Sequence, residues 1–153
     1  MSDLGRLFSD IVRLEIQLWE AVDARLKSQL GLPLTHFEPM SVIDRLPGCR
    51  VYDIATELKI TTGGTSKLVD RIEASGYCRR LPNPTDRRSS VIELTPAGRE
   101  VLERATAAFD DELEHLLRPA VPERTLRQFA VTVGRLRAAA EQRAAGAEIE
   151  DTA

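Results

Sequence analysis

Hydrophobic residues recur along most of this chain at the three- and four-residue spacing of amphipathic α-helices. The first such stretch runs from Leu4 to Leu30, and Gly31 and Pro33 are expected to end its helix. Its apolar arc is wider than one small neighbouring domain would bury. The residues of this arc are Leu4, Leu7, Phe8, Ile11, Val12, Leu14, Leu18, Trp19, Val22, Leu26 and Leu30.

A second helix is predicted from Thr35 to about Leu46. Thr35 and Glu38 have the spacing of a capping box, in which each side chain accepts a hydrogen bond from the other residue's backbone amide. Pro47-Gly48 is expected to end this helix.

Two short helices joined by a tight turn follow. The first spans Val51–Leu58, and the second runs from Thr62 to Ser75 after a break at residues 59–61. The second helix is expected to bury three apolar residues and to present four polar ones outward. The buried set is Leu68, Val69 and Ile72, and the outward set is Thr65, Ser66, Lys67 and Arg71.

Residues 77–94 resemble two short strands around a charged tip, because Pro82, Asn83 and Pro84 favour a turn. Thr95-Pro96 then has the residue order of a helix start, a capping residue followed by proline. Two more helical patterns follow, one ending before Pro119 and one starting near 122–123. The predicted fold is therefore mainly α, with a small β-hairpin.

The order helix, turn, helix, basic hairpin resembles the winged helix-turn-helix of MarR-type transcriptional regulators. The most specific part is an Asp-x-Arg followed at fixed spacing by Leu-Thr-x-x-Gly. The matching positions are Ile54-Ala55, Leu58, Thr65, Lys67-Leu68-Val69-Asp70-Arg71, Gly76-Tyr77 and Arg79 in the two helices and the start of the hairpin, then Asp86-Arg87-Arg88, Leu94-Thr95 and Gly98.

The similarity extends over nearly all 153 residues, and the length suits one winged-helix subunit. Residues 1–30 and 96–142 would form a helical dimerisation region, and residues 35–95 the winged helix-turn-helix. Residues 143–153 have few apolar anchors and are expected to form a frayed tail.

The second short helix carries small polar and basic side chains, the composition that fits a DNA major groove. Thr61 or Thr62 is expected to cap it, leaving backbone N–H groups suited to a phosphate. Gly63 and Gly64 either let the backbone approach DNA closely or indicate that the helix begins later. The candidate DNA-binding residues of this helix are Thr62, Gly63, Gly64, Thr65, Ser66, Lys67 and Arg71.

The hairpin tip carries Arg87 and Arg88. The MarR resemblance implies that Arg88 enters the minor groove and that Asp86 keeps the wing in shape. Narrow A·T-rich minor grooves attract arginine, so this contact would read DNA shape more than sequence. A solvated turn is the alternative interpretation of these charges.

The net charge of the chain is −3, which at first argues against a polyanionic partner. The distribution reverses that argument: residues 59–88 hold seven Lys and Arg against three acids, for a net charge of +4. Residues 99–153 hold eight arginines against eleven acids, for a net charge of −3. Basic charge is thus concentrated on the expected DNA-binding face.

The sequence favours none of several other classes of protein. No apolar run approaches the roughly eighteen residues of a membrane span, and the N-terminus lacks the order of a signal peptide. With Cys49 and Cys78 as the only cysteines, a reducing cytoplasm is expected. Neither a catalytic motif nor zinc-ligand spacing is present, so no enzyme activity, cofactor or metal is predicted.

The wide apolar faces of the first and last helices, together with the MarR resemblance, favour a homodimer over helices that pack within a monomer. Two recognition helices would then read half-sites of a palindromic operator roughly 34 Å apart. The predicted function is sequence-specific binding of double-stranded DNA as a transcriptional regulator, a repressor in this interpretation.

The resemblance also implies a crevice for a phenolic or other small amphipathic effector between the dimer helices and the winged domain. The candidate lining residues are Trp19, His36, Phe37, Met40 and Arg45. Two alternatives remain: a winged-helix protein-interaction module, which the basic tip disfavours, and a cysteine-based redox-sensing repressor. MarR-type oxidant sensors usually carry the reactive cysteine in the first helix, where this chain has none.

Overall fold

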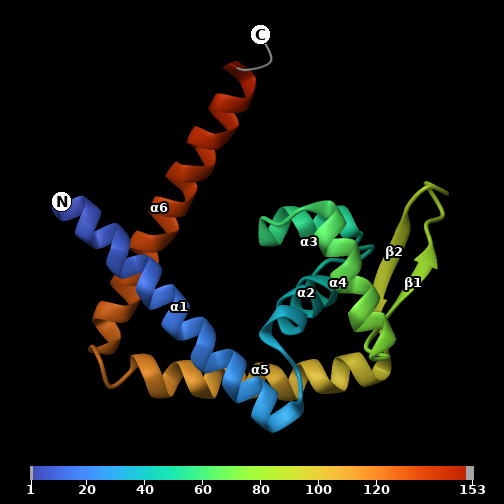
Figure 1. Ribbon diagram of the computed structural model, residues 1–153, viewed down its shortest axis with the longest axis horizontal. Helices are drawn as coiled ribbons and strands as arrows, with labels where there is room; N and C mark the ends of the chain where they lie inside the picture. Colours follow the sequence, from blue (N-terminus) through green and yellow to red (C-terminus); the bar gives the residue numbers. More distant parts are fainter. Residues whose placement is uncertain (1, 151–153) are drawn as a thin grey trace. The chain divides into compact units, whose positions relative to one another are not determined.

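The computed structural model describes the backbone of residues 2–150 and the side chains of residues 2–144. Within this range six helices accompany one two-stranded antiparallel sheet (Figure 1), which confirms the predicted fold class. The elements are α1 (Asp3–Leu30), α2 (Leu34–Arg45), α3 (Val51–Leu58), α4 (Thr62–Ala74), β1 (Cys78–Pro82), β2 (Ser90–Leu94), α5 (Pro96–Leu117) and α6 (Glu123–Glu150). The chain forms two compact units, one ending at Glu112 and the other starting at Leu113.

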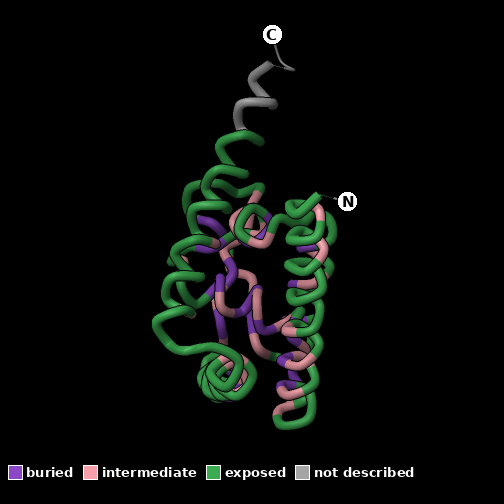
Figure 2. Tube along the Cα trace, turned by 90° about the vertical axis from the view of Figure 1, so that its left-hand side faces the viewer, coloured by how far each residue is buried: buried purple, intermediate pink, exposed green. Residues whose placement is uncertain are grey.

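Helix α1 has the bounds that its apolar pattern predicts. Gly31 follows it in the left-handed conformation (φ +64°) and donates its N–H to the Lys27 carbonyl at 3.0 Å. Only the second half of α1 is buried, at Val22 and Leu26. Its first half, which starts at the N label in Figure 2, is mostly coloured as exposed. Large apolar residues lie there, with Leu4 77% and Phe8 69% exposed.

Helix α2 begins at Leu34, and the predicted capping box is wrong. Thr35 lies inside the helix, and Pro33 occupies the capping position without a side-chain hydrogen bond. Instead, Asp23 of α1 accepts a hydrogen bond from the Leu34 amide at 2.8 Å. The cap is therefore supplied by another helix, which local spacing could not reveal.

The core of the first unit lies among α2, α3, α4, the sheet and the first part of α5. Phe37 of α2 stacks on Phe109 of α5 with ring centroids 4.9 Å apart. Burial is greatest in the winged part of the chain (Figure 2). The second half of α1 also contributes to this core through Leu26. The other large side chains that are fully buried in the first unit include Leu32, Met40, Ile54, Val69, Ile72, Ile92 and Leu94.

The Leu-Thr-x-x-Gly part of the sequence signature forms the junction between hairpin and α5. Thr95 donates its hydroxyl to the Gly76 carbonyl at 2.6 Å and accepts a hydrogen bond from the Gly98 amide at 3.0 Å. The Thr95 amide donates to the Tyr77 carbonyl at 3.0 Å. A Cβ on Gly98 would lie 1.9 Å from that same carbonyl oxygen, so only glycine allows this close approach.

The second unit contains the end of α5 and α6, which begins close to the predicted position. The backbone is helical to Glu150, so residues 143–150 of the predicted tail are helical, while residues 151–153 lie outside the described part. Several apolar side chains are exposed, including Phe129, Val131 and Leu136. No helix among residues 2–150 combines the length and apolar character that crossing a membrane requires.

Replacing Gly98 by alanine should destabilise the fold, because the added methyl group would meet backbone that cannot yield. We expect the free energy of unfolding to fall by about 1–3 kcal/mol in a urea titration. Gly63→Ala is the matched control, since a Cβ there meets no atom within 4 Å. Equal stability of Gly98→Ala and wild type would contradict the close approach.

Candidate nucleic-acid interface

Helix α4 begins where the sequence places it, at Thr62, and Thr61 is its cap. The Thr61 hydroxyl accepts a hydrogen bond from the Gly64 amide at 3.1 Å. Lys59 makes the turn before it in the left-handed conformation (φ 56°). The alternative in which the helix begins near Thr65 is wrong.

Gly63 and Gly64 both lie in the first turn of α4 and are exposed. A Cβ on Gly64 would lie 3.0 Å from the Thr61 hydroxyl oxygen, which is engaged in the cap. A Cβ on Gly63 would meet nothing within 4 Å. Glycine costs a helix about 1 kcal/mol relative to alanine, and no contact within this chain explains that cost at position 63.

Thr65 does not face outward as predicted. It is fully buried, and its hydroxyl donates to the Thr61 carbonyl at 2.8 Å. Positions 65, 69 and 72 form one helical stripe, so Thr65 shares the buried face with Val69 and Ile72. Ser66 and Leu68, on either side of the exposed Lys67, are half-buried.

Lys67 and Arg71 are exposed and lie one turn apart on α4. Next to this helix, His36 of α2 is half-buried. Burial lowers the pKa of His36, and the positive charge of Arg71 lowers it further. His36 is therefore neutral at pH 7, and Arg71 is the positive charge at this point of the surface.

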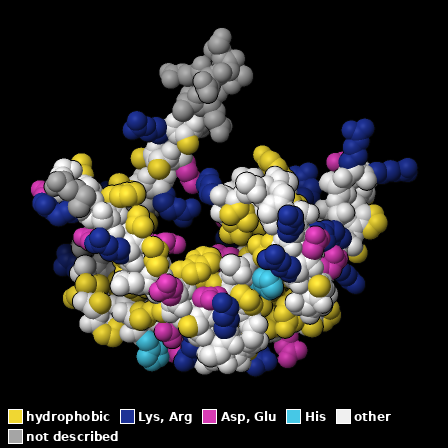
Figure 3. Space-filling model, in the orientation of Figure 1, with side chains coloured by type: hydrophobic (Ala, Val, Ile, Leu, Met, Phe, Trp, Pro, Cys, Tyr) yellow, Lys and Arg dark blue, Asp and Glu magenta, His cyan; other side chains and the backbone are white. Residues whose placement is uncertain are grey.

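The hairpin tip carries Arg87 and Arg88 in the turn between β1 and β2, where Lys and Arg side chains project from the molecule (Figure 3). No described residue forms an ion pair with either guanidinium. Asp86 accepts a hydrogen bond from the Arg88 amide at 2.9 Å, which shapes the turn. The tip therefore presents two unpaired positive charges on a defined backbone.

Asn83 stabilises the hairpin tip through its side chain. The sequence predicts only that this residue favours a turn. Its side chain is 9% exposed and accepts hydrogen bonds from the Thr85 amide at 3.0 Å and hydroxyl at 2.9 Å. It donates to the Ser89 hydroxyl at 2.8 Å, across the turn. Asparagine between two prolines is a recognisable signal for such a turn.

Two arginines of the basic stretch are paired with carboxylates within the chain, so their charges are not free for a polyanionic partner. Arg79 pairs with Glu93, its partner in the antiparallel register. Arg80 pairs with Asp70 and Glu73 of α4, each at 2.7 Å. The cations left without such partners in the described structure are Lys67, Arg71, Arg87 and Arg88.

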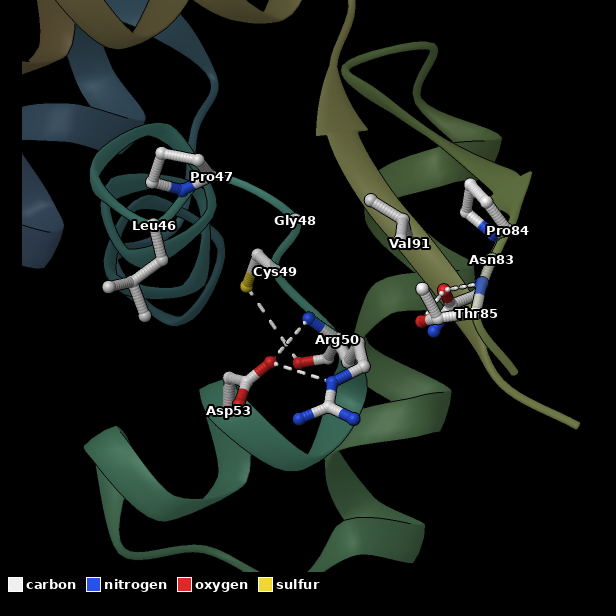
Figure 4. A pocket seen from close by; sticks show the side chains of 10 residues that line it. All are labelled: Leu46, Pro47, Gly48, Cys49, Arg50, Asp53, Asn83, Pro84, Thr85 and Val91. Atoms are coloured by element: carbon white, nitrogen blue, oxygen red, sulfur yellow. Dashed lines mark hydrogen bonds and ion pairs between the residues drawn. The ribbon is translucent and has the colours of Figure 1, made fainter.

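A cleft of about 520 Å³ separates the turn before α3 from the tip end of the hairpin, where Asn83, Pro84, Thr85 and Val91 line it (Figure 4). Arg50 and Asp53 line one side, where Asp53 accepts hydrogen bonds from the Arg50 amide at 2.8 Å and Nε at 3.3 Å. On the same side, the Cys49 carbonyl accepts the Ile92 amide of β2 at 2.7 Å. This bond joins the helix-turn-helix to the wing.

The five candidate effector-binding residues lie in different surroundings. Phe37 and Met40 are buried in the core, while Trp19 is 40% exposed. Arg45 is exposed and pairs with Glu57 of α3 at 2.5 Å. None of the five lines the cleft in Figure 4.

Cys49 and Cys78 are buried free thiols. Burial, together with a smaller contribution from a nearby carboxylate (Asp53 for Cys49 and Glu73 for Cys78), raises the pKa of each thiol to about 11. Both thiols are therefore protonated at neutral pH, and the thiolate is the reactive form. Among the described side chains, no group of three or more His, Cys, Asp or Glu could hold a metal ion.

Two solved structures illustrate the likeness of this fold to known proteins. A MarR family transcriptional regulator from Streptomyces coelicolor in complex with DNA is 23% identical, with a TM-score of 0.78 over 88% of this chain and 84% of that chain. CouR from Rhodococcus jostii RHA1, bound to p-coumaroyl-CoA, is 23% identical, with a TM-score of 0.73 over 88% of this chain and 92% of that chain.

Sequence comparison leads to the same family. Residues 32–90 match the model of the MarR family. The multiple antibiotic resistance protein MarR of Salmonella typhimurium is 30% identical over 111 residues, which cover 68% of this chain and 76% of that protein. The chain belongs to the MarR family of winged-helix, DNA-binding transcriptional regulators.

Proposed function

We propose that this protein is a repressor that binds a palindromic operator as a homodimer. The observation that carries the proposal is the placement of unpaired cations at two sites of one winged unit, the exposed side of α4 and the hairpin tip. A helix of this kind fits the major groove, and an arginine-bearing tip fits the adjacent minor groove. The complex of the Streptomyces coelicolor regulator with DNA supports this use of the fold.

The proposed roles follow from side-chain position. Lys67 is exposed in the second turn of α4 and would donate to base edges, and Arg71, one turn later, would bind a phosphate. Gly63 would allow close backbone approach to DNA. The proposed DNA-binding set is Thr62, Gly63, Gly64, Ser66, Lys67, Arg71, Arg87 and Arg88, with Asp86 shaping the wing.

The dimer is proposed because apolar surface is left exposed outside the winged part. The first half of α1 exposes seven large apolar side chains, and α6 exposes Phe129, Val131 and Leu136. Exposed apolar patches of this kind mark protein–protein contacts. Residues 1–30 and 96–142 would therefore hold two subunits together, while residues 35–95 bind DNA.

Release by a small amphipathic or phenolic effector is the second part of the proposal. The structure of CouR with p-coumaroyl-CoA supports it, because the same fold holds a phenolic ligand there. An effector would act by favouring a spacing of the two recognition helices that does not match the operator. Of the five candidate residues, Trp19, His36 and Arg45 are at least partly accessible.

Arg88→Ala should weaken operator binding about tenfold and reduce the dependence of log K on log salt by about one. The operator would come from selection of bound duplexes, which should yield a palindromic consensus. Fluorescence anisotropy titrations at several salt concentrations measure both quantities. Arg79→Ala removes the same charge from an arginine paired with Glu93 and should change affinity little. Equal losses in the two variants would contradict a minor-groove role for Arg88.

Gly63→Ala should separate stability from DNA binding. The added methyl group has open space and favours the helix, so the free energy of unfolding should rise by about 0.5–1 kcal/mol. Operator affinity should nevertheless fall about tenfold, because the methyl group would separate the α4 backbone from DNA. Thr56→Ala, at an exposed position of α3, is the control for helix propensity. Unchanged affinity in Gly63→Ala would remove Gly63 from the interface.

Redox sensing through cysteine is disfavoured by the burial of both thiols. Mild peroxide should therefore leave operator affinity unchanged, and a thiol reagent should label neither cysteine in the folded protein. Labelling after unfolding in urea is the control that both thiols are present. Loss of binding that a reductant reverses would restore the redox alternative.

A further inference from the structure

Arg80 of β1 binds three residues of the recognition helix α4. Its Nη1 lies 2.7 Å from Glu73 Oε2, and its backbone amide donates to Glu73 Oε1 at 2.9 Å. Its Nη2 lies 2.7 Å from Asp70 Oδ1 and donates to the Ser66 carbonyl at 3.3 Å. The side chain of Arg80 is 24% exposed, so this cluster is partly screened from water.

The three partners follow one side of α4, because positions 66, 70 and 73 are separated by four and three residues. Lys67 and Arg71 occupy the positions that directly follow Ser66 and Asp70 in the sequence. The side of α4 that Arg80 binds is therefore next to the side that presents the proposed DNA contacts.

Arg80 also stands close to the part of the hairpin that carries the tip. It pairs with Ile92 in the sheet register, and β1 ends two residues later at Pro82. From there the Asn83 hydrogen bonds to Thr85 and Ser89 define the turn. The Arg80 side chain thus connects α4 directly to the strand that leads into this ordered tip.

We infer that Arg80 is a positioning residue for DNA binding: it fixes the direction of the wing relative to α4, so that the tip and the recognition helix reach adjacent grooves together. The inference rests on the proposed contacts of Lys67 and Arg88 with DNA. Two linked contacts bind cooperatively only if their geometry allows simultaneous engagement.

A purely electrostatic role is the competing explanation. Removing Arg80 leaves Asp70 and Glu73 without their shared counterion beside the DNA-binding surface, and their charge would repel phosphates at any wing direction. The two explanations make different predictions when Arg80, Asp70 and Glu73 are all replaced by neutral residues. Such a cluster no longer repels phosphates, and it also no longer links β1 to α4.

The test is a double-mutant cycle on the selected operator with full-length protein. Arg88→Ala is measured in wild type and in Arg80→Gln. If Arg80 positions the wing, Arg80→Gln weakens binding, and the Arg88→Ala loss shrinks from about tenfold to less than about threefold. Hydroxyl-radical footprinting should show lost protection in the minor groove while protection around the major-groove contact remains. Arg79→Gln is the matched control and should leave the full Arg88→Ala loss.

If Arg80→Gln does not fold, the triple variant Arg80→Leu, Asp70→Asn, Glu73→Gln takes its place. It should fold because it leaves no unpaired charge in the cluster. We expect the triple variant to show the same reduced Arg88→Ala loss. Wild-type affinity and a full Arg88→Ala loss in the triple variant would overturn the inference in favour of electrostatics.

The cycle also distinguishes the inference from the function on which it rests. If Arg88→Ala costs nothing in wild type, the proposed wing contact is wrong, and the positioning role is wrong with it. If Arg88→Ala is costly and equally so in Arg80→Gln, only the positioning role is wrong.

Discussion

The winged unit depends on a single junction of backbone and side chain around Thr95. One hydroxyl there binds the carbonyl after α4 and the amide that starts α5, while the Thr95 amide binds the Tyr77 carbonyl. Gly98 makes the junction possible by leaving no Cβ against Tyr77. The end of α4, the hairpin and the start of α5 are therefore held together at this one point.

Charge in this protein has two separate uses. Arg79 forms an ion pair with Glu93 of β2, which joins the two strands. Arg80 forms an ion pair with Asp70, which joins β1 to α4. Arg87 and Arg88 have no such partners in the described structure and remain available for phosphates. Arginines that lie close together in the sequence thus differ in the structure: two stabilise the fold and two have no ion-pair partner among the described residues.

Features set by neighbouring residues were predictable from sequence, and features set by distant ones were not. The bounds of α3, the Thr61 cap and the Thr95-Pro96 helix start follow local rules, and the structure has them as expected. The Asp23 cap of α2 and the Arg80 cluster join separate elements, so spacing could not reveal them. Thr65 occupies an apolar stripe because its hydroxyl donates within the helix, and the polarity of threonine alone does not indicate this.

The hydrogen bonds inside the hairpin turn have a kinetic consequence. Asn83 accepts the Thr85 amide and Asp86 accepts the Arg88 amide, so these hydrogen bonds hold the turn in one shape without DNA. Ordering a loose loop on contact would subtract conformational entropy from every binding event. In the proposed complex, a tip that is already ordered would avoid that penalty, and diffusion and charge would govern its association with a duplex.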